Sequence, residues 1–410
     1  MILLLSRYHL RTFQQYLYQK VAYFRGVQHF NAIQYTAARR LFNKSLDYPL
    51  NNIYAALAHY WLAEIAYRED DFDAALLEIN MFEATPGSAT LSEYRRSLYN
   101  KAYAYFSKED YRNAATTFRL FLNSAKLGKK LANDAELRLA DSYFMTAQYA
   151  NAITYYTTYL GRQVPDADYA AFQRSLCYGL VDEPQKKGDA LEALVKRFPN
   201  SVYATDAYFE LGVTYTIIAS PQTAINTFDT LVKYFPKSPY FSRAILNKGL
   251  ILYNQGKLIN AQQILKNLVV LYPKDVMAKQ ALGTLKEISI DLDNVPEFTL
   301  WLRTLTIDTY TDNELEKTAF AAAEKQYLSN RKKQAKKSFL YYLDVYPSGF
   351  NSITSRFTLA EIYNEEENFD EALNYYRQTI DQGPSEYREE ALVNASKILI
   401  NNLLFKDVIP

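Results

Sequence analysis

Apolar residues recur along the chain at helical spacing, in paired stripes that are each about a dozen residues long. The stretch 199–236 shows the unit most clearly. One face of its first predicted helix carries Ala204, Tyr208, Leu211 and Tyr215. One face of its second carries Ala224, Phe228 and Leu231. Ser220-Pro221 separates the two stripes, so the unit is predicted to be helix–turn–helix.

Prolines repeat with the period of these helix pairs. Intervals of 37 residues, or close multiples of it, separate Pro49, Pro86, Pro199, Pro236, Pro273, Pro347 and Pro384. A proline disfavours helix at the residue before it, so each one is expected to end a second helix. A fixed period of this size indicates a repeat architecture built from stacked helix pairs.

Each second helix holds a small anchor residue, usually alanine, with an apolar or aromatic residue three positions before it or four after it. The anchors are Ala38, Ala75, Ala114, Ala152, Lys187, Ala224, Ala261, Ala335 and Ala372. The doubled interval between Ala261 and Ala335 predicts one degenerate repeat, whose second helix keeps Phe298, Leu302 and Leu305. Small residues of the first helices mark close helix approach: Ala63, Ala102, Ala140, Gly212, Gly249 and Ala360.

The first helices carry a Leu–Gly/Ala–x–x–Tyr run, as in Leu211-Gly212 with Tyr215 and Leu359-Ala360 with Tyr363. The second helices carry a Tyr/Phe–x–x–Ala–x–x–x–Phe/Tyr run. With the closing prolines, this pattern resembles the tetratricopeptide repeat family over nearly the whole chain, at a period of 37 residues instead of about 34. The resemblance implies an all-α, right-handed superhelix of about ten helix–turn–helix repeats.

We expect one continuous solenoid with four parts. Residues 1–17 form a helix on the first repeat, 18–275 form repeats, 276–311 hold the degenerate repeat, and 312–410 form repeats that end in a single helix. That helix either caps the array or leads into further repeats. The turn-rich stretch 179–188, which contains the anchor Lys187, is expected to be a shortened turn within one repeat.

Aromatic residues recur at two first-helix positions that look inward in the resembled family. The resemblance therefore implies a partner-binding concave groove lined by Tyr23, Tyr60, Tyr67, Tyr99, Phe106, Phe144, Phe172, Phe209, Tyr253, Phe320, Tyr327 and Phe357. Aromatic anchors dominate many peptide interfaces. The alternative is that the same rings pack between adjacent repeats as core.

Composition and charge add little chemistry. A net charge of +1 over 410 residues argues against a broad nucleic-acid surface. The single Cys177 excludes an intramolecular disulfide framework and a cysteine-rich zinc site, and a core position is expected for it. His9, His29 and His59 lack metal-ligand spacing, and neither a phosphate-binding glycine loop nor a GxSxG elbow is present. We therefore predict no enzyme, cofactor or metal.

Three charge runs have a second interpretation. Asp70-Asp71 and 365–367 suggest paired carboxylates, but they fall in the turns inside helix pairs, where solvated charge is expected. The basic run 331–337 is either a solvated helix face or a contact for an acidic peptide or anionic lipid.

The apolar stretch after Met1 is too short for a signal-peptide core or a membrane span.

The turn strings PNSVYATDAYFELG and PKSPYFSRAILNKG are similar to those of envelope-associated bacterial tetratricopeptide proteins, namely outer-membrane-assembly lipoproteins and Tol–Pal-associated proteins. The resemblance implies a periplasmic or envelope location, with a cytoplasmic one as the alternative. The expected function is a non-catalytic scaffold whose groove binds a protein or peptide partner. The alternative function is a carbohydrate- or small-ligand-binding regulatory module of a larger enzyme complex. The sequence leaves the oligomeric state open.

Overall fold

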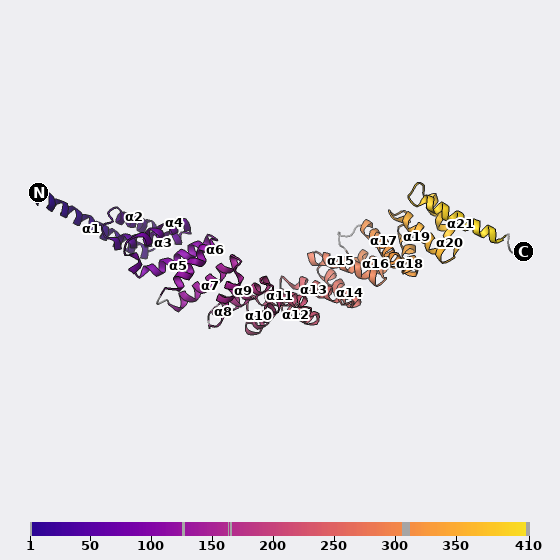
Figure 1. The fold of residues 1–410 in the computed structure, drawn as a ribbon, viewed down its shortest axis with the longest axis horizontal. Coiled ribbons are helices and arrows are strands. Elements are labelled where there is room, and N and C mark those ends of the chain that lie inside the picture. The colour runs from indigo at the N-terminus through magenta and orange to yellow at the C-terminus, as the bar shows by residue number, and fades with distance from the viewer. Residues whose placement is uncertain (1, 125–127, 163, 165, 306–311, 407–410) are drawn as a thin grey trace. The chain divides into compact units, whose positions relative to one another are not determined.

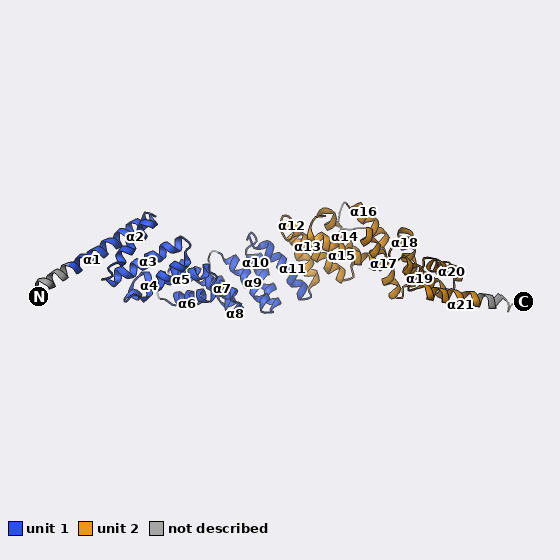
Figure 2. Cartoon of the chain, turned by 90° about the horizontal axis from the view of Figure 1, so that it is seen from above, with its two compact units in different colours: residues 1–219 blue, residues 220–410 orange. Residues whose placement is uncertain are grey.

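The computed structural model describes residues 2–124, 128–162, 164, 166–305 and 312–406. Over these residues the chain is all-α, with 21 α-helices, one short 3-10 helix and no strand (Figure 1). It divides into two compact units, residues 1–219 and 220–410 (Figure 2). Within each unit, helices that follow one another in the sequence pack side by side, which confirms the predicted class of stacked helix pairs.

The odd-numbered helices are the first helices of the pairs, and the even-numbered ones are the second helices. Unit 1 comprises α1 (Ile2–Asn31), α2 (Tyr35–Leu46), α3 (Asn52–Arg68), α4 (Phe72–Ala84), the 3-10 helix η1 (Ser88–Thr90), α5 (Glu93–Ser107), α6 (Tyr111–Leu122), α7 (Lys129–Met145), α8 (Tyr149–Leu160), α9 (Ala167–Leu180), α10 (Pro184–Arg197) and α11 (Ala204–Ile217). Unit 2 comprises α12 (Pro221–Tyr234), α13 (Phe241–Asn254), α14 (Leu258–Leu271), α15 (Val276–Asp291), α16 (Val295–Thr304), α17 (Asp312–Leu328), α18 (Lys332–Val345), α19 (Ser352–Glu365), α20 (Phe369–Asp381) and α21 (Arg388–Lys406).

The turn that leads from a first helix to a second one has the same backbone throughout. One residue in each such turn has a left-handed φ: Ile33, Asp70, Glu109, Ala147, Asp182, Ala219, Gly256, Asp293, Asn330 and Glu367. In nine of these ten turns, the residue after it donates its N–H to a carbonyl five positions back, as Gln34 does to His29 and Asn294 does to Ser289, both at 2.9 Å. This is the Schellman helix ending, and it lets the chain reverse within three residues.

The predicted anchors form the core of the pairs. All eight anchor alanines are fully buried. The residue four positions after each anchor is buried as well: Phe42, Ile79, Phe118, Tyr156, Leu191, Phe228, Leu265, Phe339 and Tyr376. Because the core recurs once per pair, each repeat is stabilised by its neighbours instead of by one central core.

Small residues lie where a first helix meets this second-helix core. A Cβ atom on Gly249 would lie 2.7 Å from Cγ of Leu265, which is four residues after the anchor Ala261. A Cβ atom on Gly26 would lie 2.7 Å from the Phe42 ring. Contacts this short would force the two helices apart, so the close helix crossing requires glycine at both positions.

Two regions of the predicted domain plan fall on well-defined helices. Residues 2–31 form the single helix α1, so the expected boundary at residue 17 lies inside a helix. The expected degenerate repeat holds α15 and α16, with the turn residue Asp293 lying 37 residues from both Gly256 and Asn330. Residues 306–311 of that repeat lie outside the described residues. The division into four parts remains a prediction.

Two of the charge runs contact each other. Lys332 pairs with Glu365, and Lys336 pairs with Glu366, so the basic run of one repeat meets the acidic turn of the next. Asp71 has a different role, since its side chain accepts the Ala74 N–H at 3.1 Å and caps α4. The exposed Lys332–Glu365 and Lys336–Glu366 pairs contribute little to stability because water and salt screen them.

Candidate functional site

All twelve predicted groove rings lie on first helices. Tyr23, Tyr60, Phe209 and Phe357 are buried. The other eight are half-buried: Tyr67, Tyr99, Phe106, Phe144, Phe172, Tyr253, Phe320 and Tyr327. Five of these eight belong to unit 1, and we call the side of its first helices that carries Tyr67, Tyr99, Phe106, Phe144 and Phe172 the first-helix face. A role of these rings in partner binding remains a prediction.

Several of the half-buried rings pack against a ring of the second helix in their own repeat. Phe106 meets Tyr111 edge-on at a centroid distance of 5.2 Å, and Phe144 meets Tyr149 edge-on at 5.8 Å. In both cases the partner ring is the first residue of the second helix. Tyr67 and Phe72 repeat the arrangement at 5.7 Å. Each of these rings therefore stabilises its helix pair through this ring contact, and the remainder of the ring is partly exposed to solvent.

Tyrosines and carboxylates link successive first helices of unit 1. Asp134 on α7 accepts hydrogen bonds from Tyr99 (2.6 Å) and Tyr103 of α5. Two turns further along α7, Asp141 accepts from Tyr169 of α9 at 3.0 Å and pairs with Arg138 at 2.8 Å. These links tie each repeat to the next one across the first-helix face.

Burial shifts the proton affinity of this network. Burial raises the pKa of the Asp141 carboxyl group. The hydrogen bonds from Tyr156 and Tyr169 and the positive charge of Arg138 act in the opposite direction, but burial has the larger effect. Burial and the bond to Asp134 raise the pKa of Tyr103 to about 12. The tyrosines of the network therefore stay neutral hydrogen-bond donors at physiological pH.

The row of rings is interrupted in α9 and α11. Gly179 and Thr216 occupy the position that Tyr67, Phe106 and Phe144 hold in earlier repeats. A pocket of about 420 Å³ opens there, and it is lined by Phe144, Leu176, Gly179, Leu180, Asp182, Pro184, Lys187, Thr214 and Ile217. Its walls come from α7, α9, α10 and α11, so the pocket lies within unit 1.

Lys187 fills part of the space that the missing ring leaves. A Cβ atom on Gly179 would lie 3.0 Å from Cδ of Lys187, so the lysine stem runs across the glycine. The ammonium group ends 2.5 Å from Glu210 of α11. The sequence interpretation named Lys187 as an anchor and placed it in a shortened turn, but the structure places it inside α10, which begins at Pro184 because a proline is well tolerated in the first turn of a helix. The missing ring at residue 179 was the signal that could have revealed this pocket.

Chemistry elsewhere in the chain is sparse. Cys177 is buried, and burial raises the pKa of its thiol to about 12. His59 contacts Glu78 at 2.7 Å. Across the described residues, no group of three or more His, Cys, Asp or Glu side chains could hold a metal ion. No helix in the part of the chain that was searched is long and apolar enough to cross a bilayer.

Comparison with known proteins gives one curated relative. Outer membrane protein assembly factor BamD of Rickettsia prowazekii (strain Madrid E) is 28% identical over 126 residues, which cover 28% of this chain and 49% of that protein. The match thus spans about half of the relative's length.

Solved structures share the fold. The structure of Naa15/Naa10 bound to HypK-THB aligns with a TM-score of 0.50 at 13% identity, over 94% of this chain and 61% of that one. A tetratricopeptide repeat protein from Parabacteroides merdae aligns with a TM-score of 0.40 at 15% identity, over 66% of this chain and 99% of that one. At 13% identity, the similarity to the Naa15/Naa10 structure shows the fold alone.

Family models agree with the helix pairs. One model of the tetratricopeptide repeat matches residues 27–89 and 99–168, and a second model of the same repeat matches residues 353–381. The matches fall in both units and cover helix pairs with buried anchors. The chain therefore contains tetratricopeptide repeats in residues 27–89, 99–168 and 353–381.

Proposed function

We propose that the chain is a non-catalytic scaffold that holds an extended segment of a partner protein along the first-helix face. The observation that carries this proposal is the pocket beside Phe144, where the row of rings is interrupted. Stacked tetratricopeptide repeats provide an interaction surface of this kind. An extended segment suits the face because its half-buried rings recur from one repeat to the next.

The pocket suits one apolar anchor of such a segment. Phe144, Leu176 and Ile217 give it apolar walls, while Asp182 and Lys187 lie at its lining as polar groups. Its volume of about 420 Å³ is enough for a large apolar side chain and neighbouring backbone. Interfaces of this kind take most of their binding energy from a few anchors in such pockets.

We place this scaffold in a bacterial envelope assembly. The relative from Rickettsia prowazekii is named as an outer membrane protein assembly factor, and the turn strings of residues 199–249 are similar to those of envelope proteins. A periplasmic or envelope-associated location follows as part of the proposal. Fractionation of the native cells tests it, and recovery in the cytosolic fraction alone would contradict it.

Site-specific photo-crosslinking tests the binding face. A photoreactive residue in place of Phe144 or Tyr67 is expected to capture the same partner band from a native envelope extract. Substitution of Thr116, which is exposed on the second helix α6 and lines neither the pocket beside Phe144 nor the one beside Arg174, serves as the matched control. Capture from Thr116 but not from the two ring positions would show that the outer side of the pairs binds instead.

Filling the pocket gives an independent test. Gly179→Phe restores the ring that earlier repeats carry, and the flexible Lys187 side chain can move aside. We expect this variant to remain helical by circular dichroism and to lose the partner crosslink at residue 67. Unchanged crosslinking would mean that the pocket is not the anchor site. Loss of capture after addition of free sugars would favour the carbohydrate-binding alternative.

A further inference from the structure

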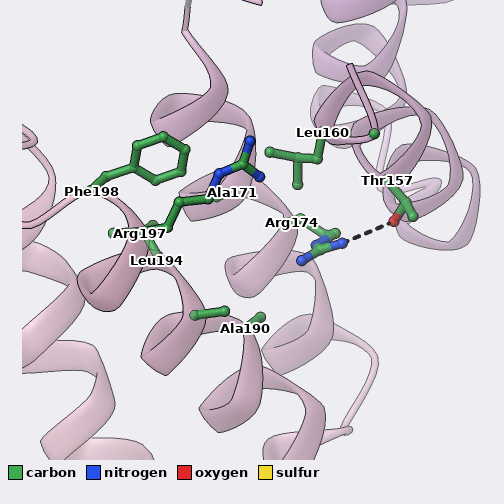
Figure 3. Close-up of a pocket in the computed structure, with 10 residues that line it drawn as sticks. Thr157, Leu160, Ala171, Arg174, Ala190, Leu194, Arg197 and Phe198 are labelled. Atoms are coloured by element: carbon green, nitrogen blue, oxygen red, sulfur yellow. Dashed lines mark hydrogen bonds between the residues drawn. The ribbon is translucent and has the colours of Figure 1, made fainter. Parts of the chain in front are cut away.

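A second pocket of unit 1 is lined by residues of the second helices α8 and α10 and of the first helix α9 (Figure 3). It has a volume of about 270 Å³. Its lining residues are Thr157, Leu160, Gly161, Ala171, Arg174, Ala190, Ala193, Leu194, Arg197 and Phe198. None of the twelve predicted groove rings lines it, so it is separate from the first-helix face.

Two guanidinium groups give this pocket its charge. Arg174 and Arg197 line it from α9 and α10, and none of its ten lining residues is acidic. Arg174 is half-buried, and its Nη1 donates one long hydrogen bond of 3.4 Å to Oγ1 of Thr157. Its Nε is buried without a hydrogen-bond partner among the described residues. At least this buried donor of the Arg174 guanidinium is therefore unsatisfied within the described residues.

Other repeats neutralise a cation at this position. Arg174 precedes the small residue of its first helix, as Lys101 and Lys248 do in theirs. Lys101 pairs with Glu83 at 2.6 Å, and Lys248 pairs with Asp229 at 2.5 Å. Both carboxylates lie on the preceding second helix.

Thr157 occupies the position of the missing carboxylate. It lies five residues after the anchor Ala152, as Asp229 lies five residues after the anchor Ala224. The contact between α8 and the next first helix, α9, thus keeps the cation and lacks the acid. A carboxylate from outside the chain would complete the pairing that Lys248 finds within it.

We propose that this pocket binds an acidic peptide segment of a partner. A Glu or Asp carboxylate of that segment pairs with Arg174 and Arg197, and an adjacent apolar side chain packs on Leu160, Ala190 and Leu194. The apolar floor beside the two charges selects a carboxylate that is carried next to an apolar residue. Arg pairs with carboxylates through two parallel hydrogen bonds, which gives this contact its direction.

Fluorescence anisotropy with the full chain tests the proposal. The probe is a labelled peptide of alternating Leu and Glu, and the matched peptide carries Gln in place of Glu. We expect the Glu peptide to bind at least about tenfold more tightly, because one charge-assisted pair is lost in the Gln peptide. Equal binding of the two peptides, or none of either, would overturn the proposal. So would displacement of the Glu peptide by inorganic phosphate at equal concentration, since the site would then be a general anion site.

Two substitutions connect the binding to this pocket. Thr157→Asp supplies an internal partner on the preceding second helix, as Asp229 does for Lys248, so it is expected to weaken peptide binding about tenfold or more and to raise the melting temperature. Arg174→Gln is expected to weaken binding similarly. Thr154→Asp adds the same charge to α8 outside the pocket lining and is expected to leave binding unchanged. Equal effects of Thr157→Asp and Thr154→Asp, or an unaltered melting temperature in Thr157→Asp, would contradict the proposal.

Discussion

Left-handed residues at the turns inside the helix pairs carry backbone strain. Of the ten such residues, only Gly256 is a glycine. An L-residue with a side chain pays roughly 1–2 kcal/mol for this conformation, and β-branched residues tolerate it least. Ile33 is the β-branched one, at a φ of 60°, and its side chain is 73% exposed. The turn geometry of the pair therefore overrides the preference of this residue.

Ile33→Gly is expected to stabilise the chain by about 0.5–1 kcal/mol. Relief of the left-handed strain exceeds the entropy that a glycine adds to the unfolded chain, and the exposed side chain buries little surface. Gly256→Ala is the matched reverse change at a φ of 70°, and a loss of about 1 kcal/mol is expected. Thermal unfolding followed by circular dichroism measures both shifts. A lower melting temperature for Ile33→Gly would show that the turn is not strained.

Cys177 is expected to be inert in the folded chain. Burial raises the pKa of its thiol to about 12, so at pH 8 only roughly one molecule in ten thousand carries the reactive thiolate. Labelling with a thiol-specific disulfide reagent should therefore be slow in native buffer and fast in urea. Cys177→Ser provides the blank. Rapid labelling of the native chain would mean that α9 opens readily or that the thiol is accessible.

Residue patterns predicted the core better than the pockets. The anchor alanines and the residues four positions later could be predicted because each obeys the helical period within a single helix. The pairing of Gly179 with Lys187 could not, because it exchanges large and small side chains between two helices. The same holds for Arg174 and Thr157, whose missing acid appears only when neighbouring repeats are compared in space.

Helix crossings are the weak points at the scale of single elements. Gly249→Leu is expected to destabilise unit 2 by roughly 1–3 kcal/mol, because even its Cβ atom would overlap the Leu265 side chain. Gly283 lies in the neighbouring α15, and a Cβ atom there meets nothing within 4 Å. Gly283→Ala should therefore stabilise the helix by about 0.5–1 kcal/mol. Urea unfolding measures both, and a neutral Gly249→Leu would mean that α13 and α14 separate easily.

The element pattern was predictable in the regular repeats and less so at the ends. Period and closing prolines predicted the helix pairs, and the doubled interval pointed to α15 and α16. The single helix α1 was not foreseen as one element, although no proline or glycine interrupts residues 2–25. Helix boundaries without such signals depend on packing against the next pair, which a local pattern does not contain.

At the scale of the whole molecule, nearest-neighbour packing limits how far any change is felt. Within each unit, the helices contact their neighbours in the sequence and, in places, the next helix but one. Stability is then a sum of repeat and interface contributions, and repeats can open locally. Half-buried rings such as Tyr67, Phe106 and Phe144 also make local contacts, since each packs against the second helix of its own pair. Sequence alone predicted where these rings lie on the helices but not how much of each is covered.

We expect the damage from Gly249→Leu to stay near its own helices. Native-state hydrogen exchange should rise in α13, α14 and α15, because their contacts surround the overpacked crossing. Thiol labelling of Cys177, which lies in α9 of unit 1, should keep its wild-type rate. An unrelated destabilisation within unit 1, Ala140→Leu, overpacks a fully buried position of α7 and should accelerate that labelling. Faster labelling of Cys177 in Gly249→Leu, with exchange rising evenly along the chain, would show that the two units unfold as one cooperative body.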